Sequence, residues 1–535
     1  MNKCGVFSND GSPNPESQIL SPGSGWLTLG LAAALPLAVH VALWCFGIPL
    51  GCPGRFVYLY SPVVSWRLSA VPQVLVLAAG LGLGVWWTAA ADTHWRRLGA
   101  VAVVAGSLGL GIWAFCAPPD YRHQYAFNAF SPSQDGAFLV EALQIEDASA
   151  YLRDFDERAA TPPAAMRGTR VISNPPGTTL LAVAARELWG RFPAIRTAVP
   201  LPTDSDDAPA AAAALQNAVG VGMLFFMLLT AAWLLAAGVL YLAGRVVLDP
   251  TGAAAYAICC AFTPATLLFV PGKDPAQLLT MAVPLGLWLW AWRDGRPLPA
   301  ALAGLACVGA ALVSLVHLWI ALITVGATLW ADAPDVARLS RTVWRVFVPA
   351  LAGALVGVGA LAGLGIDLLA IARAVAGAQA EVTRGPHAMP LLWQALGLPL
   401  FLLLAGPALW TFTLHRLRGR RATARPEPWR GARFAAAAAL GAAAVLAATI
   451  GFTNVETPRL WIPFVPLLLL GGFVRHAPAA STATDSALRA PEHRRRRALF
   501  LAVLVVVQVA CAALHWALLD PRETETRLLE QRFFG

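Results

Sequence analysis

The chain has 535 residues, of which 57% are hydrophobic and only 13% are charged. So little charge excludes an ordinary soluble protein, and many apolar runs reach the roughly 20 residues that a helix needs to cross a bilayer. A net charge of +9 would suggest a nucleic-acid partner for a soluble domain. Here the arginines lie between apolar runs, where they orient a protein in the membrane. We therefore predict an all-α polytopic membrane protein that binds no nucleic acid.

The apolar runs predict a bundle of about 13 transmembrane helices. Residues 1–24 are polar and carry little positive charge, so we expect a disordered cytoplasmic leader and not a cleaved signal peptide. One apolar run has to turn at residues 271–275, where prolines, a glycine and two charges interrupt it. Another is too long for one helix and divides near residues 314–317. The predicted spans are residues 25–48, 70–90, 98–116, 214–243, 252–270, 274–292, 298–313, 316–331, 346–365, 392–414, 434–452, 459–474 and 498–517.

The arginine positions predict the orientation of the chain. With a cytoplasmic N-terminus, every dense arginine cluster falls on the inner side, as the positive-inside rule requires. Polar segments that carry candidate chemical groups then gather on the outer face of what we predict to be a cytoplasmic (inner) membrane. The predicted regions are the leader at 1–24, N-terminal transmembrane helices at 25–116, a large outer loop at 117–213, a transmembrane core at 214–475, a basic cytoplasmic loop at 476–497, and a last transmembrane helix with a short tail at 498–535.

The large outer loop carries the first candidate residue, Asp135. Apolar residues recur at helical spacing after it, which predicts an amphipathic helix along the membrane interface with Asp135 near its start. An aspartate in that place either caps the helix or acts as a general base toward a substrate hydroxyl. Glu146 or Asp147 is a candidate second carboxylate. Otherwise the acidic residues of this segment are expected on its solvated face, namely Glu141, Glu146, Asp147, Asp154, Asp156 and Glu157.

Two further outer segments hold polar residues beside helix breakers. Later in the same loop, the sequence from Asn174 to Gly177 (Asn-Pro-Pro-Gly) predicts a rigid turn before a second amphipathic or re-entrant segment. At the turn between two spans lies Lys273, the only lysine of the chain apart from Lys3. Its compact ammonium suits a phosphate oxygen. The alternative is an ion pair with Asp274 or a position at the membrane interface.

The remaining candidates lie nearer the C-terminus. His317, at a junction of two spans, is either a structural histidine or a functional one. His387 lies in a loop with glycine and proline, where it would act as a gate or ligand. Glu456 and Arg459 flank Pro458 at a spacing that lets them pair with each other. Alternatively, Arg459 presents its planar guanidinium to a phosphate at the lipid headgroup level, and Glu456 orients it.

Cysteine and metal motifs are sparse in this chain. Cys52 and Cys116 fall just past the outer ends of two spans, so a disulfide between them is possible in an oxidising compartment. The sequence contains no HExxH, no CxxC pair and no Asp-rich ligand box. It therefore identifies no metal site or cofactor and leaves metal dependence open, since single carboxylates of the outer loop would suit a divalent cation.

Three of these features together resemble the GT-C superfamily. They are the long outer loop with an interfacial helix and an aspartate, the Pro-Pro-Gly turn after it, and the segment E-x-x-R-L-W-x-P that begins at Glu456. GT-C proteins are integral-membrane glycosyltransferases that use polyprenyl-phosphate sugars. The chain looks most similar, over roughly residues 25–475, to the branch of protein O-mannosyltransferases and aminoarabinose transferases.

The resemblance implies a role for each candidate residue. Asp135 would match the catalytic carboxylate of the first outer loop, and Lys273 or Arg459 would match cations that bind the carrier phosphate. The expected partners are a polyprenyl-phosphate sugar donor, a hydroxyl acceptor on a lipid, glycan or protein, and membrane lipids. The chain departs from the family pattern in having two extra spans before the loop and Gln134-Asp135 in place of a paired acid, which leaves a metal requirement open.

Two other classes of function also fit a polytopic chain with polar outer segments. A transporter or flippase of lipid-linked saccharides would gather polar groups near its spans, although internal repeats are not evident in the sequence. A non-catalytic envelope assembly protein would use the large loop as a binding surface. Convergence of Asp135, Lys273 and Arg459 in space would favour the transferase.

Overall fold

The computed structural model describes residues 22–46, 50–52, 56–60, 69–116, 135–161, 170–192, 209–384, 390–418, 430–453, 457–475 and 486–520. Almost all of this part is helical, and seven of its helices are long and apolar enough to cross a membrane, or up to eight if a bent pair forms one span. The chain is thus a multi-pass helical membrane protein. The predicted count of about 13 spans is not confirmed, because several predicted spans are short or broken helices.

The seven long apolar segments agree in place with seven of the predicted spans. They lie in α1 (Pro22–Cys45), α3 (Val71–Thr88), α4 (Thr93–Cys116), α11 (Pro209–Gly244), α22 (Arg430–Thr453), α25 (Ser486–Leu518), and a continuous segment made of α17 (Val336–Thr342), the π-helical turn η3 (Val343–Phe347) and α18 (Val348–Gly363). Large apolar side chains such as Leu235 and Leu440 remain exposed on them, as lipid-facing surfaces require.

Other helices, most of them shorter, lie between these segments. They are α12 (Pro250–Ala261), α13 (Pro264–Phe269), α14 (Lys273–Asp294), α15 (Pro297–Ala311), α16 (Val316–Asp332) and α24 (Val465–Arg475). Both predicted divisions are confirmed, since α14 begins at Lys273 and a gap separates α15 from α16. The prediction of one helix at 252–270 is wrong, because Thr263 caps a new helix by accepting the Thr266 N–H (3.0 Å), with Pro264 in its first turn.

The predicted span 392–414 is also two helices. α20 (Pro390–Ala405) and α21 (Pro407–Arg418) meet at an angle of 107° around Gly406, whose φ is +91°. The buried Gln508 of α25 supports the break, since its Oε1 accepts the Ala408 N–H (3.0 Å) and its Nε2 donates to the Ala405 carbonyl (3.2 Å). A break in the apolar core is tolerated here because a side chain satisfies the backbone groups that the helix leaves unpaired.

Close contact between small residues holds α15 and α18 together. A Cβ on Gly304 of α15 would lie 1.8 Å from the carbonyl oxygen of Ala350, and one on Gly353 of α18 would lie 1.9 Å from that of Ala301. Only glycine permits this approach, which replaces the hydrophobic effect as the source of helix association in lipid. α25 packs on α3, α12 and α13, while α14 packs on α11 and α15.

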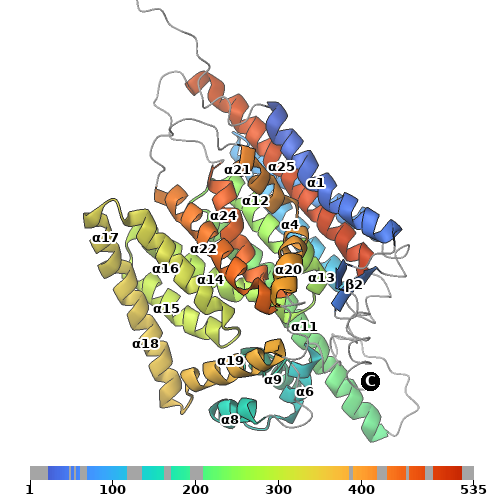
Figure 1. The fold of residues 1–535 in the computed structure, drawn as a ribbon, viewed down its shortest axis with the longest axis vertical. Coiled ribbons are helices and arrows are strands. Elements are labelled where there is room, and N and C mark those ends of the chain that lie inside the picture. Colours follow the sequence, from blue (N-terminus) through green and yellow to red (C-terminus); the bar gives the residue numbers. More distant parts are fainter. Residues whose placement is uncertain are drawn as a thin grey trace, which may run out of the picture.

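A small antiparallel sheet accompanies the helices of this all-α protein. It consists of β1 (Leu50–Cys52), β2 (Phe56–Tyr60) and β3 (Leu519–Asp520), in that order. Because β1 and β2 follow α1 and β3 ends α25, the sheet ties one end of the first long helix to the same end of the last (Figure 1).

Five helices lie together at one end of the molecule: α6 (Gly136–Gln144), α7 (Ala148–Arg153), α8 (Phe155–Ala160), α9 (Gly177–Arg191) and α19 (Leu368–Arg384). α6, α8, α9 and α19 are labelled there in Figure 1, whereas α17 and the start of α25 lie at the other end. The segment after Asp135, predicted as one helix, forms the three helices α6, α7 and α8. One of the breaks lies at Asp147, whose side chain accepts the Ser149 N–H (2.7 Å) and so caps the start of α7. The amphipathic α19, which packs on α8, was not predicted.

The expectation that Glu141 is solvated is wrong. Its carboxylate is fully buried and pairs with Arg158 at 2.7 Å, because α6 packs against both α9 and α11 and has no free side at this position. Glu146, Asp147, Asp154 and Glu157 are exposed, as expected, and Asp156 is half-buried.

Candidate functional site

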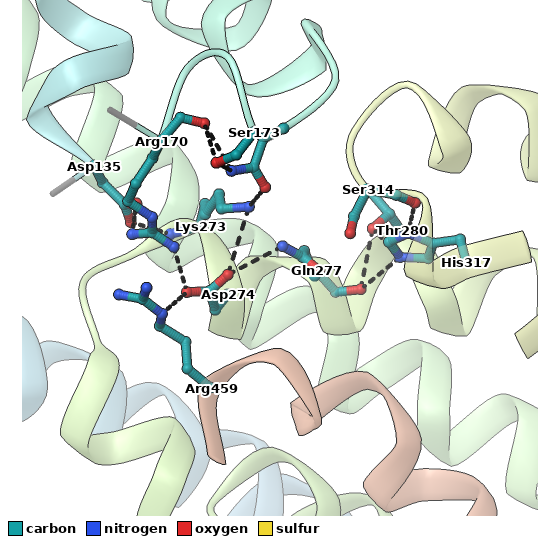
Figure 2. A network of polar contacts seen from close by, with 11 residues as sticks. Asp135, Arg170, Ser173, Lys273, Asp274, Gln277, Thr280, Ser314, His317 and Arg459 are labelled. Carbon is teal, nitrogen blue, oxygen red and sulfur yellow. Dashed lines mark hydrogen bonds and ion pairs between the residues drawn. The ribbon is translucent and has the colours of Figure 1, made fainter. Parts of the chain in front are cut away.

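A buried group of charged side chains surrounds the N-terminus of α14. Four segments far apart in the sequence bring it together: the start of α6, the turn at residues 170–176, the first residues of α14, and α23 (Thr457–Leu460). We call Asp135, Arg170, Lys273, Asp274 and Arg459 the α14 charge cluster. Figure 2 shows these five side chains pointing toward one another.

Asp135 precedes α6 but does not cap it, since its side chain makes no hydrogen bond to that helix. Its Oδ2 instead accepts the backbone N–H of Lys273 at 2.7 Å. The residue before α14 is Gly272, which has no side chain with which to cap the helix. Asp135 therefore supplies the cap from a distant segment, and its negative charge lies at the positive end of the α14 dipole.

Arg170 joins the two carboxylates of the cluster. Its Nη1 donates to Oδ1 of Asp135, and its Nη2 donates to Oδ2 of Asp274 at 2.7 Å. The guanidinium is thus shared between a residue of the outer loop and a residue of α14. The sequence pattern does not single out Arg170, and its one signal is a position four residues before the Asn-Pro-Pro-Gly turn.

The turn that carries Arg170 also holds Lys273. The Lys273 ammonium donates to Oδ1 of Asn174 and lies 3.6 Å from Oδ1 of Asp274. Asn174 in turn donates from Nδ2 to the Arg170 carbonyl at 2.7 Å. The ammonium also lies 5.8 Å from the centre of the Phe138 ring, within range of a cation–π contact. Asn174 therefore fixes both the turn and the lysine.

Asp274 is the centre of the cluster. Besides Arg170 and Lys273, it has an ion pair with Nε of Arg459 at 3.2 Å and accepts a hydrogen bond from Gln277 Nε2 at 3.1 Å. The Arg459 guanidinium lies 5.8 Å from the centre of the Phe269 ring. The predicted pairing of Lys273 with Asp274 is present, but Lys273 also has the other contacts described above.

The cluster is almost completely shielded from solvent and has an excess of positive charge. Its five residues are between 1% and 8% exposed. Three cations face two carboxylates among the described residues, which leaves one positive charge in excess. Because buried cations are stabilised by nearby negative charge, an anionic ligand would suit this arrangement.

Gly177 and His317 lie beside the cluster and support it. The Gly177 N–H donates to the Leu312 carbonyl at 2.7 Å, and a Cβ there would lie 2.5 Å from that oxygen. The turn therefore docks against the end of α15 only with glycine at this position. His317 is buried, with Nε2 2.9 Å from the Thr280 hydroxyl and Nδ1 2.8 Å from the Ser314 carbonyl. It contacts the neighbouring turn of α14 and none of the five charged residues.

The other predicted residues lie outside the described part of the chain. This applies to His387 and Glu456, and to the side chains of Cys52 and Cys116, so their roles and the disulfide stay predictions. Among the described residues, no group of three or more His, Cys, Asp or Glu side chains is placed to hold a metal ion.

Comparison with known proteins adds no family to this picture. No model of a known protein family matches the chain, and a search of curated proteins finds no similar sequence.

Proposed function

We propose that the chain is a membrane glycosyltransferase that transfers a sugar from a polyprenyl-phosphate donor to a hydroxyl group. The gathering of three buried cations beside an aspartate, in the α14 charge cluster, is the observation that carries this proposal. A phosphodiester donor has one negative charge, which these cations would attract. A site for a neutral ligand would gain nothing from them.

The charge balance also holds through the proposed reaction. The acceptor hydroxyl attacks the anomeric carbon, the bond from that carbon to the phosphate oxygen breaks, and the hydroxyl proton passes to Asp135. Asp135 loses its negative charge as the departing polyprenyl phosphate gains one, so the total charge within the site stays constant. A site shielded from water favours such a path, because no net charge has to be created inside it.

Each member of the cluster has a role in this scheme. Asp135 is the general base, and attack from the face opposite the phosphate inverts the anomeric centre. Lys273 and Arg459 bind the carrier phosphate, with the N-terminus of α14 adding its dipole. Asp274 holds the cations in place, and Asn174, Gly177 and His317 position the segments that carry them. A divalent cation is not required by this charge balance.

The proposed site belongs on the outer face of a cytoplasmic membrane. α14 has 22 residues, which as a helix spans about 33 Å, close to the thickness of a bilayer core. The charge cluster lies at its first turn, and Arg293 and Arg296 lie at or just after its other end. By the positive-inside rule, the arginine end is cytoplasmic and the cluster faces outward. The acceptor is then a lipid, glycan or protein hydroxyl outside the cell membrane.

Incubation of the purified protein with radiolabelled undecaprenyl-phosphate hexoses and a panel of hydroxyl acceptors tests the proposal. We expect a labelled product and released undecaprenyl phosphate, with both lost in Asp135→Asn. A protein that moves the intact labelled lipid across a vesicle membrane, without breaking the sugar–phosphate bond, would instead be a flippase. Binding of the donor with neither transfer nor movement would indicate an assembly protein.

A further inference from the structure

We propose that Arg170 moves its hydrogen bond from Asp135 to the carrier phosphate as the sugar leaves, and so stabilises the leaving group. This inference rests on the proposed function and adds a residue that the sequence did not single out. It makes Arg170 a catalytic residue that holds the base before the reaction and the phosphate afterwards.

The two-carboxylate geometry of Arg170 permits this exchange. Its two terminal nitrogens donate to different carboxylates, one to Asp135 and the other to Asp274 at 2.7 Å. If the bond to Asp135 breaks, the bond to Asp274 still holds the guanidinium in the cluster. A bidentate pair with a single carboxylate would have to lose both bonds at once.

The backbone of Arg170 is anchored independently of its guanidinium. Its carbonyl accepts the Asn174 Nδ2 hydrogen bond at 2.7 Å, and Asn174 Oδ1 accepts from Lys273. Gly177 docks the end of the same turn on Leu312. The side chain can therefore rotate by a small amount without moving the turn, while Lys273 stays bound to it.

The chemistry supplies the driving force for the exchange. While Asp135 is charged, it competes with the phosphate for Nη1 of Arg170. Once the acceptor proton reaches Asp135, that carboxyl is neutral, and the phosphate monoester has gained a charge. The attraction of Arg170 for the phosphate thus grows during the reaction, which is the condition for lowering the barrier instead of only binding the substrate.

A binding experiment without turnover tests this inference. Undecaprenyl phosphate is the probe, and undecaprenol, which lacks the phosphate, is its control ligand. Asp135→Asn imitates the protonated aspartate, and its amide oxygen can still accept the Lys273 N–H. We expect Asp135→Asn to bind undecaprenyl phosphate about tenfold more tightly than the native protein, the effect of one released charge-assisted hydrogen bond. Affinity for undecaprenol should not change.

The gain in affinity should require Arg170. We expect Asp135→Asn/Arg170→Gln to bind undecaprenyl phosphate no more tightly than Arg170→Gln alone, and this double variant keeps the net charge of the cluster, which protects its folding. Arg170→Gln alone should lower affinity for the phosphate, whereas Arg373→Gln, at an exposed arginine of α19, should not. A gain that persists in the double variant, or no gain in Asp135→Asn, would overturn the role of Arg170.

The same data separate this inference from the proposed function. If the native protein binds undecaprenyl phosphate no better than undecaprenol, the carrier-phosphate site itself is wrong. If it binds the phosphate selectively but the effects of the two substitutions simply add, the site stands and the exchange by Arg170 fails.

Discussion

The two ends of α14 carry buried groups of charged side chains that differ in their balance of cations and anions. At its last turn, Trp292 donates from Nε1 to Asp332 at 2.9 Å, and Arg430 donates from Nη2 to the same carboxylate at 2.7 Å. Thr342 adds a hydrogen bond at 2.8 Å, and the Arg430 guanidinium lies 4.0 Å from the Trp292 ring centre. This group has one anion and one cation, whereas the cluster at the first turn has three cations and two anions.

We propose that the difference separates a structural ion pair from a site prepared for a ligand. The Asp332–Arg430 pair is neutral and has several hydrogen-bond donors on one carboxylate, so a ligand would have to displace bonds that already balance. In the α14 charge cluster three cations share two carboxylates, and an anion would add to their stabilisation. The two ends of one helix should therefore respond differently to substitution, one in activity and the other in stability alone.

Removal of the base should have the largest effect. We expect Asp135→Asn to lower the transfer rate per folded molecule by about 10² to 10⁴-fold, the range typical for loss of a general base. Arg170 keeps its bond to Asp274, so the protein should still fold, with a lower unfolding midpoint because Arg170 loses its charged partner Asp135. Transfer of labelled hexose measures the rate, and the thermal unfolding midpoint measures folding. Glu146→Gln, at an exposed carboxylate after α6, is the matched control and should keep native activity. Near-native transfer by Asp135→Asn would remove Asp135 from the role.

The opposite end of α14 should respond in stability. Asp332→Asn leaves Arg430 without its charged partner, and we expect a loss of about 3 kcal/mol in stability, the lower end for a broken buried pair, since Arg430 is partly exposed. The unfolding midpoint in detergent checks this. Per folded molecule, transfer should be unchanged. A loss of activity at an unchanged midpoint would mean that this end of the helix also takes part in the reaction.

Two glycines of α9 sharpen the comparison between site and scaffold. Gly177→Ala would place a Cβ 2.5 Å from the Leu312 carbonyl, so we expect about 1–3 kcal/mol of destabilisation and weaker donor binding as the turn shifts. Gly190→Ala has nothing within 4 Å of its Cβ and should be neutral or slightly stabilising, because alanine favours a helix. Equal effects of the two substitutions on donor affinity would show that the turn does not position the site.

The sequence by itself determined the class of the protein and the identity of several charged residues of interest. Apolar length and sparse charge are local properties, so the long helices fall where they were predicted. Lys273 and Arg459 stood out because charge beside apolar runs is costly wherever the chain folds. Breaks with strong local signals, such as residues 271–275, were also predictable.

Only the tertiary structure decided which of these residues meet. Asp135 and Lys273 are 138 positions apart in the chain, and Arg170 gains its importance only because α6 and α14 place two carboxylates on either side of it. The burial of Glu141 and the bend at Gly406 likewise depend on neighbours from other helices. Local sequence encodes what each segment prefers, whereas the charge balance of a buried site is a sum over distant segments that exists only once they have packed together.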